Sequence, residues 1–191
     1  MSAGELDARA VRGTVTVTGA GGSGPQMVIP YAFAVSRGVR RNDIALAAKG
    51  AKATSDSELD REPGCTARAI DGDVEGTGDF GGKRWHSALT PHPHWIAVEL
   101  GQPRAIAQVI VHFADPQGRP ADFDGQASDD GQTWKTLFEE RDCQEKERYA
   151  KDIGGVTLRH FRLMILRSAS AQWPNAAQVS EVELIGAAGN P

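Results

Sequence analysis

The sequence is poor in cysteine and in long apolar runs, and it carries no excess of basic residues. Its 191 residues include two cysteines, Cys65 and Cys143, too few for a disulfide scaffold. One bridge between them and two buried free thiols both fit this pattern. No apolar stretch is long enough to span a bilayer. Glu5, Asp7 and Arg9 interrupt any signal-like region near residue 1.

The charge balance and the missing catalytic motifs exclude further classes. A net charge of −4 argues against nucleic-acid binding, which needs basic patches interleaved with aromatic residues. The chain has neither a Gly-x-Ser-x-Gly elbow nor a His-Glu-x-x-His pair. Asp129 and Asp130 are adjacent carboxylates, but neighbouring strand or turn residues face different ways. We therefore expect no catalytic activity.

The sequence does contain short alternating segments separated by turn residues. Residues 95–100 alternate apolar and polar side chains until Gly101, which is typical of a half-buried strand. No long segment keeps a helical period. This pattern predicts a β-sandwich rather than a parallel sheet with crossover helices. Its predicted core contains Trp95, Ile106, Val109, Val111, Phe123, Trp134, Leu137, Phe161, Leu163, Ile165, Val182 and Leu184.

The first part of the chain has a simpler pattern. Residues 14–18 alternate β-branched side chains, and residues 27–35 form a second candidate strand. The glycine-rich segment between them lacks the Lys-Ser/Thr ending of a phosphate loop, so it predicts a turn. We therefore expect three parts: an N-terminal extension with a hairpin over residues 1–41, a sandwich over residues 42–187, and a tail over residues 188–191.

Several motifs follow one another between residues 42 and 187, and together they resemble the discoidin domain family. That family includes the coagulation factor V/VIII C-type domains and the family 32 carbohydrate-binding modules. The resemblance implies an all-β fold: an antiparallel jelly-roll β-sandwich of the galactose-binding domain-like type. The motifs are Asn42 to Leu46 with Ala51 to Ser55, Asp71-Gly72-Asp73, Trp85-His86-Ser87, Ile106 to Phe113, Ser128 to Trp134, Arg159 to Leu163, and Ser180 to Leu184.

The resemblance also implies a structural calcium ion at the Asp-Gly-Asp turn. Calcium takes about six to eight oxygen ligands, several of them from carboxylates or backbone carbonyls. The implied set is the backbone carbonyl of Arg68, the side chain of Asp71, an oxygen of Asp73 and the carboxylate of Glu181.

This chain departs from the family pattern after the turn. The family places a Thr or Ser just before the Trp, whereas Lys83 and Arg84 stand there in this chain. Thr77 or Asp79 is a candidate replacement, and Glu183 could replace Glu181 because both lie on one strand face. The alternative is a turn that binds no metal, since Asp-Gly turns are common.

Three residues are candidates for sugar binding. In galactose-binding relatives a His after the strand-opening Trp and an Arg at the end of the central strand contact hydroxyl groups. His86 stands at the first position, but no Arg stands at the second, and the nearest one is Arg119. Trp173 is the candidate for stacking on a pyranose ring, because Pro174 and Asn175 indicate an exposed turn. A solvated charge is the alternative for Arg119.

The resemblance implies a non-catalytic carbohydrate-binding module. We expect a monomeric module of a larger secreted protein or glycan-active enzyme, with a glycan or glycoprotein as partner and a secreted or cell-surface location. The alternatives are a protein- or cell-surface adhesion domain of the same fold, and a structural accessory domain beside a catalytic partner.

Overall fold

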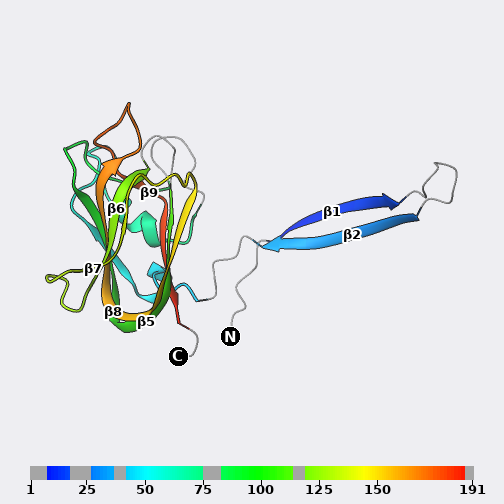
Figure 1. Ribbon diagram of the computed structural model, residues 1–191, viewed down its shortest axis with the longest axis horizontal. Coiled ribbons are helices and arrows are strands. Elements are labelled where there is room, and N and C mark those ends of the chain that lie inside the picture. Colours follow the sequence, from blue (N-terminus) through cyan, green and yellow to red (C-terminus); the bar gives the residue numbers. More distant parts are fainter. Residues whose placement is uncertain (1–7, 18–26, 37–41, 75–82, 114–118, 188–191) are drawn as a thin grey trace. The chain divides into compact units, whose positions relative to one another are not determined.

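A computed structural model describes the chain over residues 8–17, 27–36, 42–74, 83–113 and 119–187 (Figure 1). The contacts divide the chain into two compact units, Met1–Arg41 and Asn42–Pro191. Within the described residues no helix is long and apolar enough to cross a membrane.

The first unit contains a two-stranded antiparallel hairpin. Strand β1 covers Ala8–Val17 and strand β2 covers Met27–Ser36, and their register runs from Ala8↔Ser36 to Val17↔Met27. The predicted hairpin is confirmed, but β1 begins six residues earlier than the alternating Thr-Val segment indicates. Pairing with the long β2 strand extends it.

The second unit contains the remaining strands and two short 3-10 helices. All strand pairs are antiparallel, and the main sheet has the order β10-β5-β8-β6-β7, with β3 paired to β5. A separate small sheet pairs β4 with β9. The elements are η1 (Ala47–Lys49), β3 (Lys52–Ser55), η2 (Cys65–Ile70), β4 (Trp85–His86), β5 (His94–His112), β6 (Pro120–Ser128), β7 (Lys135–Glu140), β8 (Arg148–Ser168), β9 (Gln178–Val179) and β10 (Glu181–Gly186).

Strands β5 and β8 are long and pair with each other along most of their length, and both contribute to the two layers of the sandwich. The register of β5 with β8 shifts between Glu99 and Arg104, where Gly101 has a φ of 77°, a left-handed conformation that favours glycine. The first part of β5 pairs with β3, and its second part pairs with β10. The antiparallel β-sandwich predicted from the sequence is therefore confirmed.

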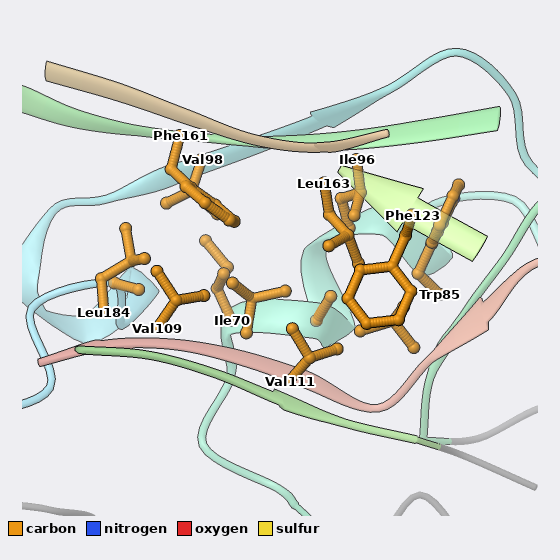
Figure 2. Close-up of a cluster of buried hydrophobic side chains, with 14 of the residues drawn as sticks. Ile70, Trp85, Ile96, Val98, Val109, Val111, Phe123, Phe161, Leu163 and Leu184 are labelled. Atoms are coloured by element: carbon orange, nitrogen blue, oxygen red, sulfur yellow. The ribbon is translucent and has the colours of Figure 1, made fainter. Parts of the chain in front are cut away.

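The core lies between these layers, and Figure 2 shows side chains from both layers pointing toward one another. Nine of the predicted core residues are buried, and Leu137 packs against the core. The predictions for Trp95 and Trp134 are wrong, because both side chains are only partly buried and lie outside the core cluster. In β5 the inward positions belong to Ile96 and Val98, so Trp95 faces the other side.

Both cysteines are free thiols buried in the sandwich. Burial raises the pKa of each thiol. Of the two alternatives left open by the sequence, the structure has the pair of buried thiols and no bridge.

Candidate functional site

The predicted metal residues meet where η2 ends beside β10. Helix η2 ends at Ile70, and the following Asp-Gly-Asp turn uses Gly72 at a φ of 92°. The backbone N–H of Gly72 donates to Glu181 Oε1 at 3.2 Å, and the N–H of Asp73 donates to Asp71 Oδ1 at 2.8 Å. The fold thus places the turn against a carboxylate 109 positions later in the chain.

Glu181 is the most unusual group in this region. Its side chain has no exposed surface, and its Oε2 atom has no hydrogen-bond partner. Burial, followed by the negative charge of Asp71, raises the pKa of Glu181 to about 9. A buried carboxylate next to a second carboxylate is unfavourable unless a cation or a proton neutralises it. Asp71 and Glu181 therefore fit a hard cation.

The other predicted ligands are arranged differently. Asp73 Oδ2 forms an ion pair with Lys83 Nζ at 3.2 Å. The Arg68 guanidinium pairs with Glu62 at 3.3 Å, and the role of the Arg68 backbone carbonyl as a ligand stays a prediction. The substitute Glu183 pairs with His112 at 2.5 Å. Thr77 and Asp79 lie outside the described residues.

Across the described ranges, no group of three or more His, Cys, Asp or Glu side chains is placed to hold a metal ion. The part of the site that the structure brings together is therefore the pair Asp71 and Glu181. Further oxygens for calcium would have to come from backbone carbonyls or water.

The predicted sugar-binding histidine lies in the small sheet. His86 of β4 pairs with Gln178 of β9, and it is only 3% exposed. Its Nε2 atom lies 3.3 Å from the Gln178 side-chain amide nitrogen, and its Nδ1 atom lies 3.7 Å from Glu62 Oε1. Burial lowers the pKa of His86, although Glu62 opposes this effect. The imidazole is therefore neutral at pH 7 and offers one donor and one acceptor.

Glu62, His86 and Gln178 form a buried polar cluster, which we call the His86 cluster. Glu62 Oε1, His86 Nδ1 and Gln178 Oε1 are buried atoms without a hydrogen-bond partner. Such atoms are uncommon in folded proteins, because burying an unpaired polar group is costly. Glu62 Oε1 and His86 Nδ1 face each other at 3.7 Å, which is beyond hydrogen-bond distance, so the cluster holds polar atoms whose hydrogen-bonding capacity is incompletely used.

Trp173 and the His86 cluster are connected through the loop between β8 and β9, the orange loop at the top of the sandwich in Figure 1. Trp173 is 40% exposed, and its backbone N–H donates a hydrogen bond to Ser170 Oγ at 2.9 Å. The loop ends at Ala177, which exchanges backbone and hydroxyl hydrogen bonds with Ser87, the residue after His86. The exposed indole and the buried cluster thus lie at two ends of one short segment.

Arg119 takes part in a different set of contacts. Its Nη1 atom donates to the Cys143 carbonyl at 2.6 Å, and its own carbonyl accepts from the Ala169 N–H at 2.9 Å. The structure records no contact of Arg119 with His86 or Trp173 among the described residues. The side chain joins two chain segments at the start of β6.

The family model of the F5/F8 type C group, described as NedA-like, galactose-binding domain, matches residues 68–163. The chain belongs to this family. A search of curated proteins gives no match. The matched segment includes the Asp-Gly-Asp turn, β4 and most of β5 to β8, so the resemblance seen in the motifs is confirmed.

Solved structures with the galactose-binding-domain fold match most of the chain. CpGH89CBM32-5 from Clostridium perfringens, solved with GalNAc-β-1,3-galactose, is 19% identical, with a TM-score of 0.60 over 71% of this chain and 95% of that one. The family 32 module of C. perfringens NanJ, in complex with galactose, is 15% identical, with a TM-score of 0.57 over 70% of this chain and 92% of that one. A Streptococcus pneumoniae fucose binding module is 18% identical, with a TM-score of 0.59 over 76% of this chain and 95% of that one. These likenesses show a shared fold.

Sequence reasoning missed Glu62 and Gln178. Glu62 lies in an irregular polar turn, and no motif marks it. Gln178 precedes the Ser180 motif and reaches His86 only through the β4–β9 pairing, across 92 positions of sequence. The apolar alternation around β9 gives no sign of this pairing. The roles of the seven predicted site residues in this galactose-binding domain stay predictions.

Proposed function

We propose that this chain is a non-catalytic carbohydrate-binding module whose site comprises Trp173 and the His86 cluster. The observation that carries the proposal is the set of three buried polar atoms without a hydrogen bond beside the loop that exposes an indole. Sugar sites combine such elements, because an aromatic ring stacks on a pyranose while a few polar groups bind hydroxyls. Membership of a galactose-binding family supports the same ligand class.

Each group of the proposed site has a defined chemical role. The carboxylate of Glu62 accepts hydrogen bonds from hydroxyl groups, the neutral His86 donates or accepts one, and the Gln178 amide supplies an acceptor. Their unpartnered atoms have almost no accessible surface. A hydroxyl group therefore reaches them only after a neighbouring side chain moves. Trp173 needs no such movement, because its ring is already exposed.

The test is calorimetric titration of the chain with galactose, N-acetylgalactosamine and fucose. We expect a dissociation constant of roughly 0.1–1 mM, because a small exposed ligand buries little area and loses ordering entropy. Trp173→Ala should weaken binding about tenfold or more and leave the fold intact. Leu166→Ala is the matched control, because Leu166 is an apolar side chain of similar exposure on β8.

Three outcomes would count against this assignment. If Trp173→Ala unfolds the protein, the indole is structural. If Trp173→Ala and His86→Ala both keep full affinity, the sugar binds elsewhere. If none of the sugars binds the parent chain, a protein partner and an adhesion role become the better explanation.

We also propose a structural calcium ion at Asp71 and Glu181. Support comes from the buried, unpartnered Oε2 of Glu181 beside a second carboxylate. Bound calcium would neutralise both charges and hold the turn against β10. A secreted or cell-surface location, where calcium and glycans are abundant, completes the proposal.

A further inference from the structure

The outer face of the main sheet carries an arginine between two tryptophans. Arg162 of β8 lies with its Cζ atom 4.1 Å from the ring centroid of Trp134 and 6.0 Å from that of Trp95. Trp95 comes from β5, where it pairs with Met164 and is the diagonal neighbour of Arg162. All three side chains are partly buried. We call this group the Trp95–Arg162–Trp134 platform.

Arg162 differs from two other arginines of its own strand, Arg159 and Arg167. Arg159 forms an ion pair with Glu99 at 2.7 Å, and Arg167 forms one with Asp122 at 2.8 Å. Among the described residues, no carboxylate lies within ion-pair distance of Arg162. Partial burial lowers the pKa of Arg162, and no neighbouring negative charge opposes this effect. The platform thus contains a partly desolvated cation without a counter-ion.

The guanidinium is held in position by its neighbours. Arg162 Nε donates to the side-chain oxygen of Gln126 on β6 at 2.8 Å. The indole of Trp134 covers one side of the guanidinium through a cation–π contact. The two terminal Nη nitrogens make no hydrogen bond within the described part of the chain. They form a fixed, planar pair of donors, which is the geometry that binds a carboxylate through two parallel hydrogen bonds.

We propose that the Trp95–Arg162–Trp134 platform binds a carboxylate-bearing pyranose, such as a uronic acid residue of an acidic glycan. The Nη nitrogens of Arg162 pair with the sugar carboxylate, and the indole of Trp95 contacts the pyranose ring. A simple inorganic anion would use only the arginine, whereas a uronic acid uses the arginine and an aromatic ring. This site lies on the sheet face, apart from the loop that carries Trp173, and it does not depend on sugar binding there.

The probe is methyl β-D-glucuronide, followed by NMR of the tryptophan indole N–H signals and by titration. The neutral methyl β-D-glucoside and acetate are the matched ligands. We expect the glucuronide to shift the Trp95 and Trp134 signals with a dissociation constant of about 1 mM, because single exposed sugars bind weakly. The glucoside and acetate should leave both signals unchanged at the same concentration. Raising the salt concentration should weaken glucuronide binding, because an exposed ion pair is screened.

Variants of neighbouring arginines on one strand give the decisive comparison. Arg162→Gln should weaken glucuronide binding at least tenfold, and Arg162→Lys should recover only part of the loss, because lysine lacks the planar fork. Arg159→Gln removes the same charge a few residues away and should leave the affinity unchanged. Galactose titration of Arg162→Gln reports on the loop site and should match the parent chain.

Several results would overturn the proposal. Equal losses in Arg162→Gln and Arg159→Gln would mean that glucuronide senses only the overall charge. Equal signal shifts with acetate would mean that the platform binds anions without recognising a sugar. Full affinity in a folded Arg162→Lys variant would show that the bidentate contact does not form. Unchanged indole signals with glucuronide would show that the platform does not bind it.

Discussion

The two faces of the main sheet use neighbouring residues for opposite purposes. On the inner face, Ile96 of β5 and Phe161 of β8 are almost fully buried in an apolar core. One residue away on the same strands, Trp95 and Arg162 lie on the outer face and contact each other. The position along the strand, rather than the apolar character of the side chain, decides which face a residue occupies. A tryptophan is therefore available for contacts outside the core.

The two faces also differ in what stabilises them. The inner side chains are held by burial of apolar surface and by close packing, which together contribute about 1.5–3 kcal/mol per large side chain. The outer side chains are held by cation–π and hydrogen-bond contacts, which contribute roughly 0.5–2 kcal/mol each. Substitutions of adjacent residues should therefore have very different effects on stability.

The largest expected effect is the contrast between Phe161→Ala and Arg162→Ala. Phe161→Ala should lower the free energy of unfolding by about 3–5 kcal/mol, because it leaves a cavity in the core. Arg162→Ala should lower it by only about 1 kcal/mol, because the outer face is open to water. Chemical denaturation of both variants measures the difference. Similar losses in the two variants would mean that the outer face is as tightly packed as the inner one.

The two-residue period with which side chains alternate along a strand explains how much of the fold could be predicted. Alternation along the strands found nine buried core residues, and the order of motifs gave the sandwich. The prediction that Trp95 lies in the core fails because Ile96 and Val98 occupy the inward positions of β5. Trp134 comes just before β7, where the strand period does not yet apply. For Trp95, the position along the strand predicts the side that the residue faces better than the apolar character of its side chain does.

The candidate sites show a different limit of sequence reasoning. The Asp-Gly-Asp turn is a local signal, and the family order added Glu181 from the far end of the chain. Glu62 and Gln178 have no local signal, because only tertiary contacts bring them to His86. The unpaired charge of Arg162 cannot be seen in the sequence either, because only the folded structure shows that Glu99 pairs with Arg159 and Asp122 with Arg167.

Glu181 is a carboxylate in the apolar interior of the sandwich, and calcium binding is the proposed reason for its position. Calcium that binds only the folded state should stabilise it by about 2.7 kcal/mol when its free concentration is about 100-fold above the dissociation constant. Thermal unfolding with calcium and with a chelator measures this difference. Glu181→Gln should abolish the response to calcium without lowering the stability measured in chelator, because the amide needs neither a cation nor a proton to neutralise it beside Asp71.

Glu183→Gln is the matched control for the calcium experiment. Its carboxylate pairs with His112, so the variant should change stability equally with and without calcium and keep the calcium response. If Glu183→Gln loses the response and Glu181→Gln keeps it, the ligand assignment is reversed. No response in the parent chain would remove the metal from the proposal.

Gly125 tests how closely the inner face is packed near β7. A Cβ atom on Gly125 would lie 2.2 Å from ring carbons of Phe138, so Gly125→Ala forces the ring or the backbone to move. We expect a loss of about 1–3 kcal/mol in the free energy of unfolding. Gly186→Ala is the control, because its Cβ would meet its nearest atom at an ordinary 3.6 Å. Equal effects in the two variants would show that the Phe138 ring yields easily.

The smallest expected effect is at Asp130, in the solvent-facing turn between β6 and β7. Its Oδ1 atom accepts hydrogen bonds from the N–H groups of Gln132 and Thr133 at 2.8 and 2.7 Å, and from Ser128 Oγ at 2.9 Å. These bonds hold the pKa of Asp130 well below its ordinary value of 3.8. Because the folded-state pKa is the lower one, the stabilisation is present above pH 3.8 and is lost as the pH falls below it.

Asp130→Asn should therefore lower the melting temperature at pH 7 by less than Gly125→Ala does, because the turn is exposed. Its difference from the parent chain should shrink as the pH is lowered toward about 2.5, because the unfolded parent then binds a proton on Asp130 whereas the folded parent keeps the carboxylate ionised. Asp129→Asn is the control, because its exposed carboxylate makes none of these bonds and should leave the melting temperature unchanged at every pH. A difference for Asp130→Asn that stays constant down to that pH would mean that the shape of the turn, rather than the charge of the carboxylate, provides the stabilisation.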